Sequence, residues 1–244
     1  MRAVLFGATR GIGRAVAREL AQRGDSLFLL GRDEAELARS CADLRLRGAA
    51  AADFLHCDLL EPRGFEPALA RAEEVLGGVD AVVVSAGLFA PQAELERDPA
   101  LLERVLSADF VHTVGFCEVA RRRLLARGGG TLCALSSVAG DRARAPAALY
   151  GAAKAGLSHY LEGLDHGYRS QGLRTVCVKP GFVRTGMTAG LPEPPFAASP
   201  ERVARSIVRA IDRGRPVVYA PPIWRAVMLA VRALPRALMR RLRF

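Results

Sequence analysis

Short apolar segments alternate with longer helical segments along almost the whole chain, and this alternation is what most limits its possible folds. Strands are expected at residues 2–6, 26–30, 51–56, 79–84, 131–135, 173–178 and 216–220. Helices are expected between them, at 11–23, 33–46, 64–76, 100–127, 147–171 and 199–213, with another in the tail. Strands that alternate with helices form parallel sheets, because each parallel connection needs a long crossover. The sequence therefore predicts an α/β fold, a doubly wound parallel sheet of about seven strands with helices on both faces.

The length of 244 residues, half of them hydrophobic, favours one domain with a large core. We expect residues 1–220 to form the sheet with its helices, and residues 221–244 to form a basic amphipathic tail. Nothing at the N-terminus is typical of a signal peptide, and no apolar run is long enough to span a membrane. A cytoplasmic protein is the expectation.

Cysteine, histidine and charge patterns argue against several classes of function. The five cysteines lie far apart without a CxxC pair, so buried free thiols are expected. The four histidines have no ligand-like spacing, and no metal is expected. Much of the net charge of +10 comes from residues 221–244, which hold six arginines and no acid. Because no DNA-binding motif accompanies this charge, we expect no nucleic acid partner.

A glycine-rich turn follows the first expected strand and opens the first expected helix. It runs Gly7-Ala8-Thr9-Arg10-Gly11-Ile12-Gly13. Glycines let the backbone approach a pyrophosphate, and a helix N-terminus provides N–H donors and positive potential. A tight structural turn is the alternative, but the order of strand, turn and helix favours dinucleotide binding and a Rossmann-like sheet.

The segment 131–154 holds side chains whose spacing allows chemistry. Its strand, residues 131–135, is expected to place Ser136 and Ser137 at its carboxyl end, and Tyr150 and Lys154 follow four residues apart on one helical face. An ammonium close to a tyrosine stabilises the phenolate and so lowers the tyrosine pKa. Ser137 can hydrogen-bond a substrate carbonyl, and Ser136 is the lesser candidate. A Tyr–Lys pair also occurs by chance, so the interpretation depends on the other motifs.

Together, GATRGIG, SSVAG and YGAAK resemble the short-chain dehydrogenase/reductase family, whose active site is formed by Ser, Tyr and Lys. The resemblance implies an NAD(P)-dependent enzyme that reduces a carbonyl to an alcohol or catalyses the reverse. Tyr150 would transfer the hydroxyl proton and Ser137 would polarise the carbonyl. Lys154 would lower the tyrosine pKa and bind the nicotinamide ribose.

Asp109 departs from the family pattern. The segment RVLSADFVHTVGF aligns with one in which an asparagine holds a water of the proton relay to the lysine, and Asp109 stands at that position. An aspartate can hold this water, but its negative charge competes with the tyrosinate for the Lys154 ammonium. Asp109 is therefore a catalytic candidate, whereas His112 is expected to pack.

The resemblance also implies a set of cofactor-binding residues. Arg10 and Arg32 stand where family members that prefer NADP carry arginines, and Gly31 offers no acid to a ribose hydroxyl. We therefore expect NADP(H) to be preferred over NAD(H). Helix capping is the alternative role for Asp58, whose implied role is adenine binding. The implied set is Gly7, Thr9, Arg10, Gly11, Ile12, Gly13, Arg32, Asp58, Leu59, Ala86, Gly87, Tyr150, Lys154, Pro180, Gly181, Val183 and Thr185.

The substrate has more than one interpretation. SSVAGDRARAP, PGFVRTGMT and the ending YAPPIWRAVMLAVRALPRALMRRL are similar to decaprenylphosphoryl-2-keto-erythro-pentose reductases, which implies a lipid-linked keto-sugar. A soluble ketone, sugar or acyl thioester is one alternative. A non-catalytic dinucleotide-binding or membrane-scaffold protein is another. The irregular loop 181–199 has the glycines and prolines of a lid.

The tail carries an apolar helical stripe, bent at Pro235, with arginines on its other faces. The stripe comprises Ile223, Val227, Val231, Leu234, Leu238 and Leu242. One interpretation is a helix docked on the body or on a neighbouring subunit of a homodimer or homotetramer. The other is peripheral contact of residues 223–242 with the anionic inner face of the membrane.

Overall fold

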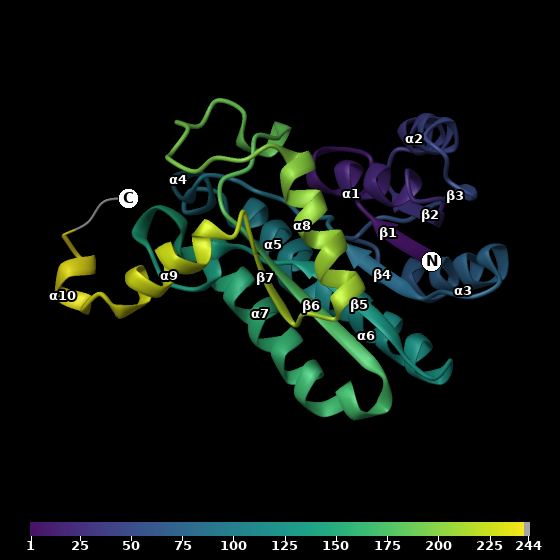
Figure 1. Cartoon of the computed structure of the whole chain (residues 1–244). Coiled ribbons are helices and arrows are strands. Elements are labelled where there is room, and N and C mark those ends of the chain that lie inside the picture. Colours follow the sequence, from purple (N-terminus) through teal and green to yellow (C-terminus); the bar gives the residue numbers. More distant parts are fainter. Residues whose placement is uncertain (242–244) are drawn as a thin grey trace.

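The computed structural model describes residues 1–241, which form a single domain built on one seven-stranded parallel sheet (Figure 1). The strands are β1 (Arg2–Phe6), β2 (Ser26–Gly31), β3 (Ala51–His56), β4 (Ala81–Val84), β5 (Gly130–Leu135), β6 (Leu173–Pro180) and β7 (Val217–Ala220). Their order in the sheet is β3-β2-β1-β4-β5-β6-β7. The strand order reverses between β1 and β4, and sheets of this kind bind ligands beyond the carboxyl ends of such strands. The predicted doubly wound α/β fold is confirmed.

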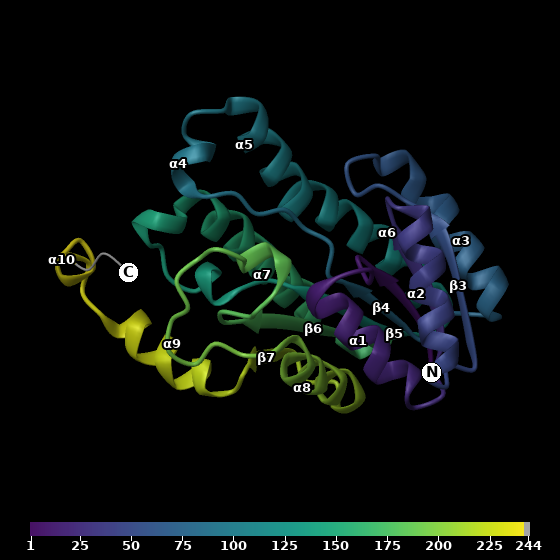
Figure 2. The ribbon, with the colours of Figure 1, turned by 90° about the horizontal axis from the view of Figure 1, so that it is seen from above.

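Helices cover both faces of the sheet, which lies between two helical layers in Figure 2. Helices α1 (Gly11–Ala21), α2 (Glu34–Leu46) and α8 (Pro200–Arg213) pack on one face. Helices α3 (Phe65–Leu76), α6 (His112–Ala126) and α7 (Ala148–Tyr168) pack on the other. The remaining helices are α4 (Gln92–Leu95), α5 (Pro99–Leu106), α9 (Ile223–Ala233) and α10 (Arg236–Met239).

The central strands are apolar throughout because both of their faces are buried. In β1, Ala3 and Leu5 belong to the core beneath α1, α2 and α8, whereas Val4 and Phe6 belong to the opposite core. Phe6, the last residue of β1, directly precedes the glycine turn. Its ring makes edge-on contacts with Phe65 and Phe116, with centroids 6.2 Å and 4.8 Å away. The residue before the glycine turn therefore anchors that turn to the core.

The expected helix at 100–127 is interrupted in the structure. A π-helical turn, Ser107–Val111, lies between α5 and α6, and it contains Asp109. The extra residue in this turn changes which backbone N–H and C=O groups pair with each other. The Thr113 hydroxyl donates a hydrogen bond to the Ala108 carbonyl. The structure thus corrects the prediction of one regular helix, and the deviation is located at a candidate catalytic residue.

The tail forms two short helices, α9 and α10, that extend away from the sheet beyond β7 (Figures 1 and 2). The members of the expected apolar stripe differ in exposure. Val227, Val231 and Leu234 are half-buried, and Ile223 and Leu238 are exposed. Met228, which lies outside the expected stripe, is the buried residue of α9. The last expected member, Leu242, lies outside the described residues. The stripe is thus neither fully docked nor fully exposed.

The other observations on the fold concern thiols, metal ligands and membrane spans. All five cysteines are buried free thiols, as expected. Within residues 1–241, no cluster of His, Cys, Asp and Glu side chains has an arrangement suited to a metal ion. No helix in the same range combines the length and apolarity needed to cross a membrane.

Candidate active site

One cleft of about 690 Å³ lies at the carboxyl ends of the central strands and contains every residue expected at the site. The turn after β1 forms one part of its wall, with Gly7, Thr9, Arg10, Gly11, Ile12 and Gly13. The ends of β2, β3 and β4 add Arg32, Asp58, Leu59, Ala86 and Gly87. Ser137, Tyr150, Lys154 and Asp109 line it as well, with Pro180, Gly181, Val183 and Thr185 after β6. Because parallel strands end at the same edge, residues far apart in sequence meet here.

The glycine turn has the shape that close approach of a phosphate group requires. Gly7 and Gly11 have φ of 91° and 54°, in the left-handed region that favours glycine. Helix α1 begins at Gly11 without a side-chain cap, so the first N–H groups of the helix remain available at the cleft. A Cβ atom at Gly13 would lie 2.3 Å from the Gly7 carbonyl oxygen. The turn and the helix start therefore fit a dinucleotide pyrophosphate.

Ser85 braces this turn, a role that sequence reasoning did not assign. Its hydroxyl donates to the carbonyl oxygens of Phe6 and Gly7, at 3.0 Å and 3.2 Å. The Ala86 N–H also bonds the Phe6 carbonyl, at 2.9 Å. Ser85, which directly follows β4, therefore links this strand to the turn after β1.

Two arginines line the cleft beside the glycine turn and the end of β2. Arg10 and Arg32 are both exposed and line the wall, next to the buried Gly31. Asp58 is also there, but its Oδ1 accepts a hydrogen bond from the Leu60 N–H at 2.9 Å. This bond stabilises a turn and does not cap a helix, because the helices that follow have Glu61 and Gly64 at their N-caps. The helix-capping alternative for Asp58 is therefore wrong, and Asp58 lines the cleft. Arg14, which we did not expect at the site, lines the wall as well and pairs with Glu36 at 2.6 Å.

Tyr150 is a half-buried side chain at the other end of the cleft, near the start of α7. Burial raises the pKa of its hydroxyl, the Lys154 charge lowers that pKa, and Asp109 raises it. The Lys154 Nζ lies 5.5 Å from the centre of the Tyr150 ring. The lysine therefore acts in the expected direction, but burial outweighs it, so the net shift is upward rather than downward. The ring also packs edge-on against Phe89, with the ring centroids 5.4 Å apart.

The two candidate serines have different surroundings. Ser137 follows β5 at the cleft and is half-buried, and its Oγ accepts from the Ala139 N–H at 3.1 Å. The hydroxyl proton is not used in that bond. Ser136 is buried, and its hydroxyl is within 2.8 Å of the Lys154 carbonyl oxygen and 2.7 Å of the Ser158 hydroxyl. Ser136 thus holds α7 in place, and Ser137 is the serine available to a ligand.

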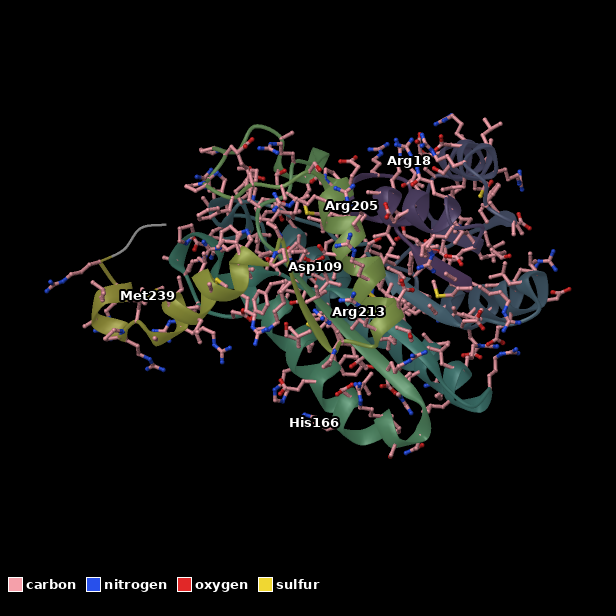
Figure 3. All side chains as sticks on the ribbon, viewed as in Figure 1. Arg18, Asp109, His166, Arg205, Arg213 and Met239 are labelled. Carbon is pink, nitrogen blue, oxygen red and sulfur yellow. The ribbon has the colours of Figure 1, made fainter. Side chains whose placement is uncertain are left out.

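Asp109 is fully buried, and it is labelled near the centre of the view in Figure 3. Its Oδ1 accepts from the Leu88 N–H at 2.8 Å, and its Oδ2 lies 3.7 Å from the Lys154 Nζ. Oδ2 has no hydrogen-bond partner among the described residues. Burial raises the pKa of the Asp109 carboxyl, although Lys154 lowers it. Lys154 also donates to the Leu135 carbonyl, at 3.2 Å, so this carbonyl and the aspartate both attract the ammonium.

His112 and the loop after β6 complete the surroundings. The His112 Nδ1 is 3.0 Å from the Leu59 carbonyl oxygen, so this histidine packs against the β3 side, as expected. A backbone bridge between Val183 and Ala198 closes the base of the expected lid. The Thr188 hydroxyl donates to the Val183 carbonyl at 2.6 Å. Met187 also lines the cleft from this loop.

Comparison with known proteins assigns the family. Residues 1–195 match the sequence model of the short chain dehydrogenase family. The chain belongs to this family. As a short-chain dehydrogenase, it is 34% identical to an uncharacterized oxidoreductase of Mycobacterium tuberculosis, over 98% of this chain and 96% of that one. It is 30% identical to carbonyl reductase family member 4 of Xenopus tropicalis, over 85% and 89%. The predicted family and enzyme class, an NAD(P)-dependent oxidoreductase, are confirmed.

A solved structure supports the same assignment of this short-chain dehydrogenase. The chain superposes on a crystal structure of an actinorhodin polyketide ketoreductase variant with NADPH, with a TM-score of 0.81. The two are 25% identical, and the match covers 90% of this chain and 96% of the other. The specific resemblance to decaprenylphosphoryl-2-keto-erythro-pentose reductases stays a prediction.

Proposed function

We propose that this short-chain dehydrogenase reduces a carbonyl compound with NADPH, using Ser137, Tyr150 and Lys154. The observation that carries the proposal is their meeting in one cleft with the glycine turn. The turn fits a dinucleotide pyrophosphate, and the Tyr150 end of the cleft is left for the nicotinamide and the substrate. When bound, the dinucleotide supplies the hydride.

Tyr150 is the proton donor of the proposed reaction. Burial raises the pKa of its hydroxyl, so the tyrosine is protonated at neutral pH and is suited to act as an acid during reduction. The Lys154 ammonium stabilises the phenolate that remains after the proton has left. Ser137 donates a hydrogen bond to the carbonyl oxygen, which gains negative charge as hydride arrives.

Asp109 is proposed to act through Lys154. Its free Oδ2, 3.7 Å from Nζ, is placed to hold a water next to the ammonium. The same carboxylate attracts the ammonium away from the phenolate of Tyr150. Asp109 therefore opposes the stabilisation that Lys154 gives to the tyrosine, and an asparagine at this position would remove the opposing charge.

The first prediction concerns the relative affinities for NADPH and NADH. NADPH should bind at least about tenfold more tightly than NADH, roughly 1.4 kcal/mol, because Arg10 and Arg32 would pair with the 2′-phosphate that only NADPH carries. Arg32→Ala should remove most of this preference. Titration of cofactor fluorescence measures both affinities, and NADH serves as the control because its affinity should be nearly unchanged in the variant. Equal affinities of the wild-type protein for the two cofactors would refute the preference.

The tail supports a second, finer proposal, contact with an anionic membrane surface and hence a lipid-linked keto-sugar as substrate. Ile223, Leu229 and Leu238 are 43%, 72% and 42% exposed. The described part of the tail also carries Arg225, Arg232, Arg236, Arg240 and Arg241, and residues 221–244 include no acid. Apolar side chains among cations suit a surface of anionic lipid. A soluble ketone or acyl thioester remains the alternative substrate.

Vesicle binding tests the tail. The protein should sediment with vesicles that contain phosphatidylglycerol and should be released as salt rises, because salt screens the attraction. Replacement of Arg236, Arg240 and Arg241 by glutamine should reduce sedimentation strongly. Vesicles of phosphatidylcholine alone are the control. If the protein does not sediment with anionic vesicles at low salt, membrane contact is refuted and a soluble carbonyl compound becomes the favoured substrate.

A further inference from the structure

Trp224, the only tryptophan of the chain, lies directly against a residue of the cleft. It stands in the first turn of α9, and its indole lies against Gly181. A Cβ atom at Gly181 would lie 1.9 Å from the indole Nε1 and 2.2 Å from Cε2. Gly181 itself lines the cleft, immediately after β6. The indole therefore occupies the space that a side chain at position 181 would need.

The indole nitrogen has an unusual environment. Nε1 of Trp224 is buried without a hydrogen-bond partner among residues 1–241. Tryptophan N–H groups usually find a partner when buried, so this placement carries a cost. Gly181, which directly follows β6, donates its N–H to the carbonyl of Ala220, the last residue of β7, at 3.1 Å. The turn after β6 is thus fixed by a backbone bond to β7 and by an indole from the helix that follows β7.

The tail is attached to the active-site loops at a second place. The Arg142 Nη2 donates to the carbonyl oxygen of Leu234, at the end of α9, at 2.7 Å. Arg142 lies in the loop between Ser137 and Tyr150. The tail therefore reaches both segments that border the reactive end of the cleft.

A buried ionic group joins the same segments to β7. Asp141 accepts from the Tyr219 hydroxyl of β7 at 2.7 Å and from the Lys179 Nζ at 2.5 Å. The side chains of Asp141 and Lys179 are only 3% and 13% exposed. Asp141 follows the Ser137 turn, and Lys179 directly precedes Pro180. The strand that leads into the tail is thus tied to the loops on both sides of the reaction centre.

We propose that Trp224 is a positioning residue for the segment 180–185, and that α9 is part of the active-site framework. The inference rests on the proposed function, since this segment is the one that would meet the nicotinamide. The indole prevents Gly181 from moving outward, toward the tail. The adenosine half of the cofactor would bind at Arg10 and Arg32, on other elements. Trp224 should therefore affect the nicotinamide half of the site selectively.

Two ligands separate this role from a general effect on folding. Calorimetry compares NADPH with adenosine 2′,5′-bisphosphate, which has the adenosine half and no nicotinamide. In Trp224→Ala, affinity for NADPH should fall by about tenfold, whereas affinity for the bisphosphate should change by less than about twofold. Trp224→Phe should recover most of the loss, because its ring still covers Gly181. Leu46→Ala, a truncation of a 90% exposed side chain, is the matched control and should bind both ligands normally.

A double-mutant cycle tests the contact from its other side. Gly181→Ala should weaken NADPH binding because the new Cβ collides with the indole. This variant does not change the sequence of the tail helix, so it tests the contact even if Trp224→Ala folds poorly. In the Trp224→Ala background, the same substitution should have little further effect. Additive losses, or unchanged NADPH affinity in Trp224→Ala, would overturn the positioning role while the proposed function stands. If the wild-type protein binds neither NADPH nor NADH, both proposals are overturned.

Discussion

Tyr150→Phe is expected to lower the turnover of carbonyl reduction by about a thousandfold, within the range that general acids contribute. Phenylalanine keeps the ring and its edge-on contact with Phe89 but has no proton to give. Neither the glycine turn nor the two arginines of the cleft is altered. NADPH affinity should therefore change little, and the loss should appear in kcat.

The measurement is steady-state oxidation of NADPH over a panel of ketones, acyl thioesters and lipid-linked keto-sugars. Tyr168→Phe, at the last residue of α7, is the matched control and should keep full activity. Turnover of Tyr150→Phe similar to that of the wild-type protein would show that another group donates the proton. A wild-type protein that binds NADPH but reduces no member of the panel would favour the non-catalytic alternative.

Lys154→Met is expected to destabilise the fold by about 3–5 kcal/mol and to remove activity, because it leaves a fully buried carboxylate without its cation. Asp109 would retain only the Leu88 N–H as a partner. Burial already raises the pKa of Asp109, and Lys154 opposes that rise. A carboxyl whose pKa is higher in the folded state contributes stability at low pH and loses it as pH rises through the folded pKa. The destabilisation should therefore be larger at high pH.

Urea unfolding at about pH 5 and about pH 8 measures this effect. The matched control is the double variant Lys154→Met with Asp109→Asn, which has no buried carboxyl at this position. It should recover most of the stability at the higher pH but none of the activity. Equal stability of Lys154→Met and the wild-type protein at the higher pH would contradict the account of this pair.

Most of the fold could be predicted from the sequence because the apolar runs and the helical segments between them indicate the same architecture. Apolar runs buried on both faces read as strands, and capped helical segments separate them, as where Asp33 caps α2 through the Glu36 N–H. The site residues were accessible for a related reason. Ser137, Gly87 and Pro180 each stand at the end of a strand or just beyond one, and parallel strands end at one edge.

The π-helical turn at Asp109 could not be predicted, because a period of 3.6 residues fits the segment 100–127 as well. The turn accompanies tertiary contacts that periodicity does not reveal, since its Asp109 carboxylate meets the Leu88 N–H and the Lys154 ammonium from other parts of the chain. The brace from Ser85 was missed for a similar reason, since a serine after a strand has many possible roles. Only the position of the Phe6 and Gly7 carbonyls shows which one it has.

The tail shows a further limit of periodicity. An apolar stripe predicts an amphipathic helix but not which of its members meets the body. In the structure Met228 is buried, Leu229 is 72% exposed, and Trp224 covers a glycine of the cleft. Gly181 leaves room for the indole because it has no side chain, a relation between two positions that neither residue reveals alone.

Isotope transfer tests the central claim, hydride transfer from the nicotinamide to a carbonyl carbon at the Tyr150 end of the cleft. The protein is incubated with NADPH deuterated at the transferable position of C4 and with each carbonyl compound of the panel, and the products are analysed by mass spectrometry. The account predicts an alcohol that carries one deuterium on its carbinol carbon, and its near absence with Tyr150→Phe. An alcohol without deuterium, or no alcohol from any compound while NADPH is bound, would contradict it.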